Sequence, residues 1–308
     1  MAAAIAEGTH TADLTGEPQY VRGLVDRHHR AARDAGVRIV NCCGFDSIPS
    51  DLGTLVLQQA AQERLGGPCP TVRSVVWAAK GGFSGGTAAS AVELMADAED
   101  PAVRAQLADP YSLDPGGRGT AAARELRGVR KDPDAGWVAP WLMASINERV
   151  VRRSNALLGY PWGEDFAFTE VLRTGRGARG ALTALGVSAG VNAAMVALTT
   201  RLGRRLARRV LPSPGEGPSE EAIARGFYVL KLFGERDGQR VTVEAKGQGD
   251  PGYGATSRML AAVGACLARD GERLGAPGIT TPAAGLGAPL VERLARADIT
   301  FTASSGPS

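Results

Sequence analysis

The chain has 308 residues, 44% of them hydrophobic and 22% charged, as expected of a globular protein with a sizeable core. Its 35 basic and 32 acidic residues leave a net charge of +3, too small to indicate a nucleic-acid partner. Four cysteines and three histidines without metal-ligand spacing argue against a metal site or a disulfide framework, and favour a reducing cytoplasm. The first ten residues lack the basic region and apolar length of a signal peptide.

Strands and helices alternate over the first third of the chain. Residues 9–15 predict a short strand, and 17–36 a helix that ends at a glycine. Residues 37–43 are almost continuously apolar, as in a strand covered on both faces, and 48–67 predict a second helix. This order predicts a parallel, nucleotide-binding type of layer.

The remainder predicts a different kind of sheet. A strand at 71–80 leads into a glycine-rich turn and a helix, and 98–136 reads as a long loop-bearing excursion. Residues 226–247 predict a hairpin with Asp237 and Gly238 in its turn. The chain then predicts an amphipathic helix at 254–271 and closes with a helix and a strand at 288–302.

Seven motifs, in order, carry a family resemblance over about residues 7 to 302. They are "GTHTADLTGE", "CCGFDSIPSDLG", "GGFSGGTAAS", "VVRRSNALLGYPWG", "PGEGPSEEA", "GDPGYGATSRML" and "TTPAAGLGAPLVERLARADITF". Together they resemble the saccharopine dehydrogenase-like oxidoreductases, most closely the actinobacterial trans-acting enoyl reductases. The resemblance implies an α/β fold with a partial Rossmann-like parallel layer at 1–62 and a larger mixed or antiparallel sheet domain at 63–280. It also implies that a final helix and strand at 281–308 return toward the first part.

Family members begin with a strand and a Gly-rich turn that bind the dinucleotide, upstream of the "GTH" stretch. We therefore expect a chain that lacks this N-terminal half and by itself binds neither NADH nor NADPH, whereas a chain extended upstream binds both. The strand at 37–43 would lack most of its flanking strands, so we also expect poor solubility or self-association through an open edge. A smaller departure is Thr11, where the family usually has an aromatic residue.

The resemblance implies an NAD(P)H-dependent oxidoreductase that reduces enoyl thioesters on a carrier protein, in lipid or polyketide synthesis. The alternative is a non-catalytic remnant, or a membrane-peripheral partner module without its cofactor site. The upstream reading frame distinguishes the two, because only the enzyme requires a strand and a Gly-rich turn there.

The first candidate site follows the strand at 37–43. Asp46 and Ser47 lie where open α/β sheets bind ligands and are candidate catalytic residues, although either side chain could simply cap the next helix. In the family this edge resembles the wall beside the nicotinamide, which makes Gly44 and Phe45 candidate cofactor contacts.

The second candidate is the turn "GGFSGGT". Its glycines would let backbone N–H groups approach a thioester oxygen or a phosphopantetheine phosphate. A tight strand-to-helix turn with Thr87 as the N-cap is the alternative. The candidate substrate-binding residues are Gly82, Ser84, Gly85, Gly86 and Thr87.

Two further side chains have candidate roles. If 150–155 form a strand, Arg152 and Arg153 point to opposite faces, so one of them, assigned as Arg153, could bind a substrate carboxylate or a cofactor phosphate. The alternative is surface exposure. Tyr253 could donate a proton after hydride transfer, although its Pro and Gly neighbours first predict a turn.

Residues 180–200 carry no charge, a length that matches a membrane span, but small and polar residues dominate. A buried or peripheral helix, contact with a membrane surface and a true span all remain open. The helix that follows opposes arginines to Leu202, Leu206 and Val210, which suits an anionic lipid surface or an acidic carrier protein, or simply a solvated face. The arginines are Arg201, Arg204, Arg205, Arg208 and Arg209. A peripheral position at the inner membrane face is therefore one hypothesis.

Overall fold

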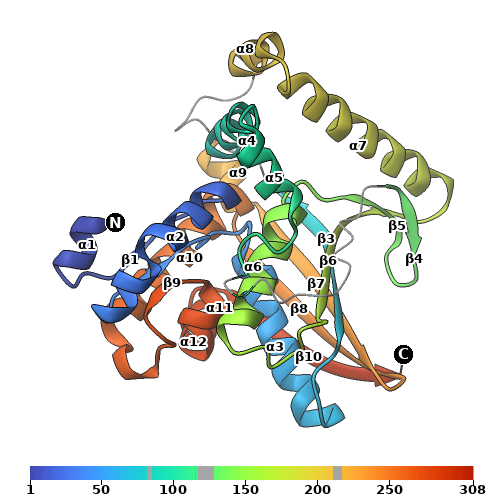
Figure 1. Cartoon of the computed structure of the whole chain (residues 1–308). Coiled ribbons are helices and arrows are strands. Elements are labelled where there is room, and N and C mark those ends of the chain that lie inside the picture. Colours follow the sequence, from blue (N-terminus) through green and yellow to red (C-terminus); the bar gives the residue numbers. More distant parts are fainter. Residues whose placement is uncertain (82–84, 115, 117–127, 211–216, 308) are drawn as a thin grey trace.

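The computed structural model describes residues 1–81, 85–114, 116, 128–210 and 217–307, which form two sheets surrounded by helices (Figure 1). The smaller sheet is parallel and has the strand order β1-β2-β9. Its strands are β1 (Thr11–Ala12), β2 (Arg38–Val40) and β9 (Gly278–Thr280).

The predicted helices on either side of β2 are confirmed. Helix α2 (Pro18–Asp34) begins with proline in its first turn, where the missing N–H costs no hydrogen bond. Helix α3 (Ile48–Leu65) begins in the same way and ends at Gly66, whose φ of 74° is the left-handed conformation that glycine adopts easily. A short helix, α1 (Ala2–Ala6), precedes β1.

The larger sheet has seven strands in the order β10-β8-β7-β3-β6-β5-β4. Strands β3 and β6 are parallel and every other pair is antiparallel, so the predicted mixed sheet is confirmed. Asp237 and Gly238 have φ values of 50° and 75°, the two-residue turn predicted for the β7–β8 hairpin. The strands are β3 (Thr71–Lys80), β4 (Arg130–Asp132), β5 (Gly136–Pro140), β6 (Ala167–Gly175), β7 (Phe227–Arg236), β8 (Gln239–Gln248) and β10 (Ile299–Pro307).

Helix α3 lies against β7, β8 and β10 of the larger sheet and forms the centre of the main hydrophobic core. Leu52 and Leu57 are completely buried there. A Cβ at Gly53 would approach Leu232 of β7 to 3.0 Å, so the small residue lets the helix pack closely on the sheet. Burial on nearly all sides explains why α3 shows little amphipathic pattern.

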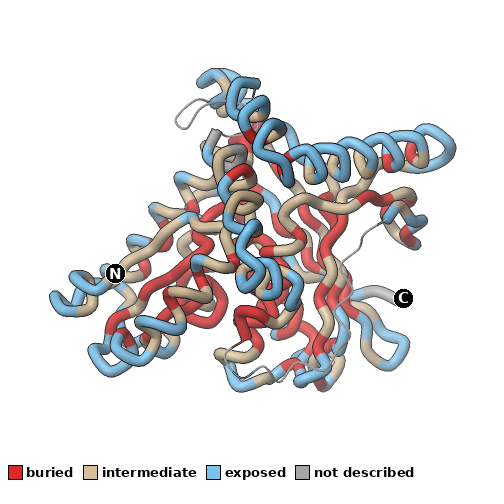
Figure 2. Tube along the Cα trace, turned by 45° about the horizontal axis from the view of Figure 1, so that its top comes forward, coloured by how far each residue is buried: buried red, intermediate tan, exposed pale blue. Residues whose placement is uncertain are grey.

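The other helices cover the two sheets or extend from them. They are α4 (Gly85–Asp97), α5 (Pro101–Ala108), α6 (Ala144–Leu157), α7 (Gly177–Leu198), α8 (Arg201–Val210), α9 (Glu220–Ala224), α10 (Thr256–Arg269), α11 (Pro282–Gly285) and α12 (Gly287–Ala295). Figure 2 shows that most of α7 is exposed, unlike the helices packed on the sheets.

Several predicted boundaries are wrong. Strand β2 ends at Val40 because Cys42 has a φ of 61°, which turns the chain out of the extended conformation. It also has a neighbour on each side, so the predicted open edge at β2 does not exist. The loop-bearing segment at 98–136 also contains α5 and β4.

The last strand also differs from the prediction. Strand β10 pairs with β8 in the larger sheet, while β9, just before the predicted boundary at 281, returns to the parallel layer. Long-range pairing decides this choice, and a strand pattern alone does not specify its partner.

Candidate functional site

A cavity of about 510 Å³ lies at the carboxyl ends of β1 and β2. The loops after these strands form one wall, and α4 and α6 form others. Met195 of α7 and the turn at 251–252 also contribute, so segments from most of the chain meet here. Ligands of open α/β sheets bind at this strand edge.

Most of the cavity wall is apolar. Its large apolar side chains are Leu14, Leu94, Met95, Leu107, Leu142, Met143, Ile146 and Met195. Three of the eight are methionines, whose flexible side chains can adapt to an irregular ligand. A lining of this kind suits an acyl chain or an uncharged ring better than a charged metabolite.

Asp46 is the carboxyl group at the inner wall of the cavity. Burial and, to a smaller extent, the negative charge of Glu17 together raise its pKa to about 6. A carboxyl with this pKa is partly protonated near neutral pH and can donate a proton.

Glu17, the other acidic group of the wall, has the opposite shift. Burial alone would raise its pKa, but hydrogen bonds from Ser90, Thr15 and the Gly16 N–H outweigh burial and lower it. Thr15 Oγ1 lies 2.6 Å and the Gly16 nitrogen 2.9 Å from Glu17 Oε2. The cavity thus pairs an ionised carboxylate with a carboxyl that retains its proton to higher pH.

Ser47 begins a chain of buried polar groups that leads away from the cavity. Its hydroxyl donates to Asn147 Oδ1 at 2.9 Å, and Asn147 Nδ2 donates to Glu170 Oε2 at 2.6 Å. Ser50 and Ser74 donate to the other oxygen of Glu170, whose pKa burial raises. This network holds α3, α6 and the strands β3 and β6 in register behind the cavity wall.

Asp51, in the first turn of α3, is completely buried outside the cavity lining. Its carboxylate accepts hydrogen bonds from Ser154 and from the Ala283 N–H. Burial nevertheless dominates and raises the pKa of Asp51 to about 7. Asp51 therefore links α3, α6 and α11, and its contribution to the free energy of unfolding depends on pH.

We expect stability to fall as the pH rises toward 7, partly through Asp51. Its pKa is about 7 in the folded chain against 3.8 for an ordinary Asp, so the folded state holds a proton that the unfolded state loses. Between pH 5 and pH 7 this group should lower the free energy of unfolding by about 2 kcal/mol, and the loss should be complete about one pH unit above 7.

Urea denaturation of wild type and Asp51→Asn at several pH values measures this contribution. In Asp51→Asn the free energy of unfolding should fall less between pH 5 and pH 7 than in wild type. In Asp270→Asn it should fall as in wild type, because Arg293 holds the pKa of Asp270 at about 2. An unchanged slope in Asp51→Asn would contradict the assignment.

Gly44 and Phe45 have different surroundings. Gly44 lines the cavity, and a Cβ there would approach Thr256 and Leu14 to 3.2 and 3.3 Å. The Phe45 ring instead packs in the core, 4.8 Å from the Tyr228 ring centroid. Its N–H donates to Thr256 Oγ1 at 3.0 Å, so Phe45 helps to shape the turn rather than the cavity surface.

Part of the glycine-rich turn can be placed. Gly82 and Ser84 lie outside the described residues, whereas α4 begins at Gly85 and Gly86 lines the cavity. Thr87 is the third residue of α4, so the alternative that it is the N-cap is wrong.

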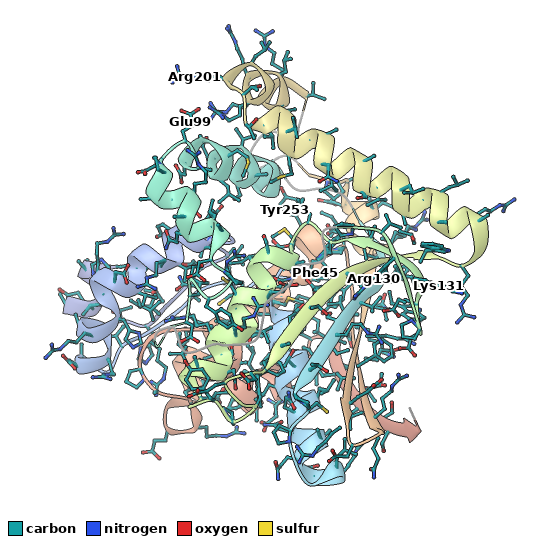
Figure 3. All side chains as sticks on the ribbon, turned by 45° about the vertical axis from the view of Figure 1, so that its right-hand side comes forward. Phe45, Glu99, Arg130, Lys131, Arg201 and Tyr253 are labelled. Atoms are coloured by element: carbon teal, nitrogen blue, oxygen red, sulfur yellow. The ribbon has the colours of Figure 1, made fainter. Side chains whose placement is uncertain are left out.

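Arg153 does not reach the cavity, and its segment is helix α6 rather than a strand. The side chain is 1% exposed, and its guanidinium donates to the carbonyls of Leu113 and Ile279, each at 2.7 Å. Tyr253 lies in a single π-helical turn capped by Asp250, beside the lining residues Pro251 and Gly252 (Figure 3). Its ring is not among the lining groups described for the cavity.

The sequence interpretation missed Glu17, Thr256 and Arg149 as cavity residues. Glu17 had a usable signal, because it follows a short strand and precedes a proline, the same context that singled out Asp46 and Ser47. The sequence held no such signal for Arg149, because its position in the cavity wall depends on how α6 packs. Its guanidinium donates to backbone carbonyls, including that of Leu107.

The cavity fits one end of a nicotinamide dinucleotide but not the other. The apolar wall suits an uncharged ring, whereas a pyrophosphate needs cations or a helix N-terminus. Among the described lining residues the charged groups are Glu17, Asp46 and Arg149. The guanidinium of Arg149 already donates hydrogen bonds to backbone carbonyls. The described wall therefore does not fit the pyrophosphate, and the chemistry it supports is that of the acyl group and its proton.

Comparison with known proteins gives consistent names. A Mycobacterium tuberculosis protein named for trans-acting enoyl reduction is 41% identical over 98% of this chain and 75% of its own length. The trans-acting enoyl reductases of Mycobacterium bovis and Mycobacterium leprae are 36% and 33% identical over 97% of this chain, again with 75% of their own length covered.

Other comparisons add less. No protein-family model matches the chain. Among solved structures, the apo saccharopine dehydrogenase of Saccharomyces cerevisiae aligns with 99% of this chain and 81% of its own, at a TM-score of 0.48 and 13% identity. The mycobacterial relatives confirm the resemblance carried by the seven motifs. On these similarities, the chain belongs to the trans-acting enoyl reductase family of oxidoreductases.

Proposed function

We propose that the chain provides the acyl-binding and proton-donating part of an enoyl reductase, which reduces acyl or polyketide thioesters presented by a carrier protein with NAD(P)H as the reductant. The observation that carries the proposal is the apolar cavity at the carboxyl edge of the parallel layer, with a partly protonated carboxyl on its wall. The family name supports an enoyl group as the target, and acting in trans supports a substrate delivered by a partner.

The apolar wall would bind the acyl chain and exclude water from the reacting carbons. Apolar side chains from α4 and α6 both line the cavity, so a chain of several methylenes could bury its length against them. Each buried methylene stabilises binding by about 0.8 kcal/mol. Affinity should therefore grow with chain length until the cavity is full.

Asp46 would supply the proton. Reduction of an enoyl thioester adds a hydride to the β-carbon and a proton to the α-carbon; a nicotinamide cofactor, when bound, would supply the hydride, and Asp46 would supply the proton. The raised pKa keeps part of Asp46 protonated at neutral pH, while ionised Glu17 beside it disfavours a second negative charge. Ser47, bound to Asn147, would position the Asp46 turn.

A bulky residue in the cavity tests the acyl site. Ala91→Trp places an indole in the α4 wall, and we expect it to weaken binding of long-chain enoyl thioesters by about 15-fold if two methylenes are displaced. A four-carbon enoyl thioester should be affected little. KM values over a series of chain lengths measure the difference.

The matched control is Ala105→Trp, on the exposed side of α5 outside the cavity. It should leave the chain-length dependence unchanged. Equal effects of Ala91→Trp on short and long substrates would argue against an acyl site in this cavity.

The finer parts of the proposal concern cofactor and location. Fluorescence titration with NADH and NADPH tests whether the chain is a complete reductase or a partner module without its cofactor site. A cytoplasmic enzyme at the inner face of a membrane is the location we propose, since its carrier-bound products enter lipids.

A further inference from the structure

Two consecutive helices, α7 and α8, present an apolar surface that the described residues leave uncovered. Only Gly180, Ala184 and Leu198 of α7 are buried, while Leu182, Leu185 and Val196 are 56–68% exposed. Among the described helices, α7 alone is long and apolar enough to cross a membrane, by length and composition only. We call residues 177–210 the α7–α8 arm.

Helix α8 continues this surface and adds charge. Leu202, Leu206 and Val210 recur every four residues and are 50–82% exposed, so they form one stripe. Arg205 and Arg209 are exposed at the next positions around the helix and bind no carboxylate within the described part of the chain. An exposed apolar stripe with cations beside it is typical of helices that lie in a lipid interface.

The five arginines do not form the single outward face expected from the sequence. Arg204 is buried and binds Glu99 and the carbonyl of Leu198, and Arg208 binds Glu93 at 2.6 Å. Arg208 thus joins α8 to α4, and Arg204 joins it to the turn that follows α4. Arg201 lies 3.8 Å from Glu99 and remains 89% exposed, on the outer side of the same junction (Figure 3). Arg201, Arg205 and Arg209 are therefore the cations available to a partner.

We propose that the α7–α8 arm docks the enzyme on an anionic membrane surface, with both helices lying in the interface. Charge complementarity selects the lipid: arginines flank the apolar stripe of α8, and headgroup phosphates complement them. The uncharged part of α7, residues 180–198 and about 28 Å long, would lie along the acyl boundary. An acidic carrier protein would match the arginines but leave the apolar side of α7 uncovered.

A second copy of the chain fits the arm less well. A two-fold pairing of the α8 stripes would bring Arg205 and Arg209 near their own copies, and like charges repel. A lipid surface covers the stripe and neutralises the arginines at once.

The docked arm would also orient the cavity, a step that rests on the proposed function. Met195 of α7 lines the cavity. Helix α4, which α8 contacts through Glu93 and through Glu99 just after the helix, forms one of the cavity walls. A membrane under the arm would therefore lie beside the cavity, where apolar acyl chains are to be received. Vesicle binding itself requires neither substrate nor cofactor, so it can be tested apart from catalysis.

Sedimentation with vesicles tests the docking surface. Wild type should sediment with vesicles of equal parts phosphatidylglycerol and phosphatidylcholine and not with phosphatidylcholine alone. Raising the salt from roughly 50 mM to 500 mM should weaken binding. Arg205→Gln with Arg209→Gln should weaken it about 30-fold. Leu202→Ser with Leu206→Ser should weaken it at every salt concentration.

The control is Arg269→Gln with Arg296→Gln, which removes the same charge from exposed positions on α10 and beyond α12. It should bind vesicles like wild type. The proposal is overturned if wild type ignores anionic vesicles, or if the Arg205 and Arg209 variant binds them unchanged. It is also overturned if ultracentrifugation shows a dimer that the Leu202 and Leu206 variant dissociates, or if an acidic carrier protein binds the arm while vesicles do not.

Discussion

Asp46→Asn is expected to lower the turnover of an enoyl thioester by about 10²- to 10⁴-fold, the usual contribution of a general acid. Asparagine keeps the shape of the side chain but has no carboxyl proton to give. The substitution removes a group at the cavity wall whose pKa burial raises to about 6, so binding should change less than turnover. Steady-state kinetics with a fixed acyl chain measure kcat and KM separately.

The pH profile distinguishes proton donation from a structural role. Wild-type kcat should fall as the pH rises through about 6, because Asp46 loses its proton, and the variant should lack this limb. Glu17→Gln removes the negative charge that helps to raise the pKa of Asp46, so the limb should move to lower pH. Unchanged profiles in both variants would exclude Asp46 as the acid.

Local signals were sufficient for much of the fold. Helices α2 and α3 are bounded by proline in the first turn and glycine at or after the end. The β7–β8 hairpin is specified by alternation and an Asp-Gly turn. Asp46 and Ser47 were found because the chemistry of a parallel sheet concentrates at one edge, and that edge follows directly from strand order.

The rest of the site depends on contacts that no short segment records. The cavity needs α4, α6 and α7 to meet over the loops after β1 and β2. Residues 150–155 read equally as strand or helix, because two valines precede two arginines. Only the packing of α6 shows that Arg153 points inward to carbonyl groups. In the same way, only the packing of α8 shows which of its arginines bind carboxylates in and after α4 and which face solvent.

Arg153 covers the edge of the parallel sheet, which lies at β9. Strand β9 lies at the edge of the parallel sheet, and the backbone of Ile279 points away from β2. The nitrogen and the carbonyl oxygen of Ile279 both lie 3.2 Å from His29 Nδ1, which accepts from the N–H or donates to the carbonyl according to the tautomer of the ring. Burial lowers the pKa of His29, and nearby Arg153 lowers it further. The Ile279 carbonyl accepts a shorter hydrogen bond from Arg153, at 2.7 Å.

Arg153→Ala is expected to lower the free energy of unfolding by about 3 to 5 kcal/mol. Each of the two buried carbonyls left without its donor costs about 1 to 3 kcal/mol, and the emptied space adds about 2 kcal/mol. Removing the charge offsets part of this loss of stability, because the buried guanidinium is itself unfavourable, as its pKa of about 10 indicates. Urea denaturation followed by circular dichroism measures the change.

Two further variants identify the cause of the loss. Arg153→Met fills most of the space without a donor, so it should recover only the packing part of the loss. Arg296→Ala, at an exposed position, should change stability by less than about 0.5 kcal/mol. If Arg153→Met is as stable as wild type, the carbonyls of Leu113 and Ile279 do not need the guanidinium. The edge of the parallel sheet would then be held by packing alone, and Arg153 would be available for a different role.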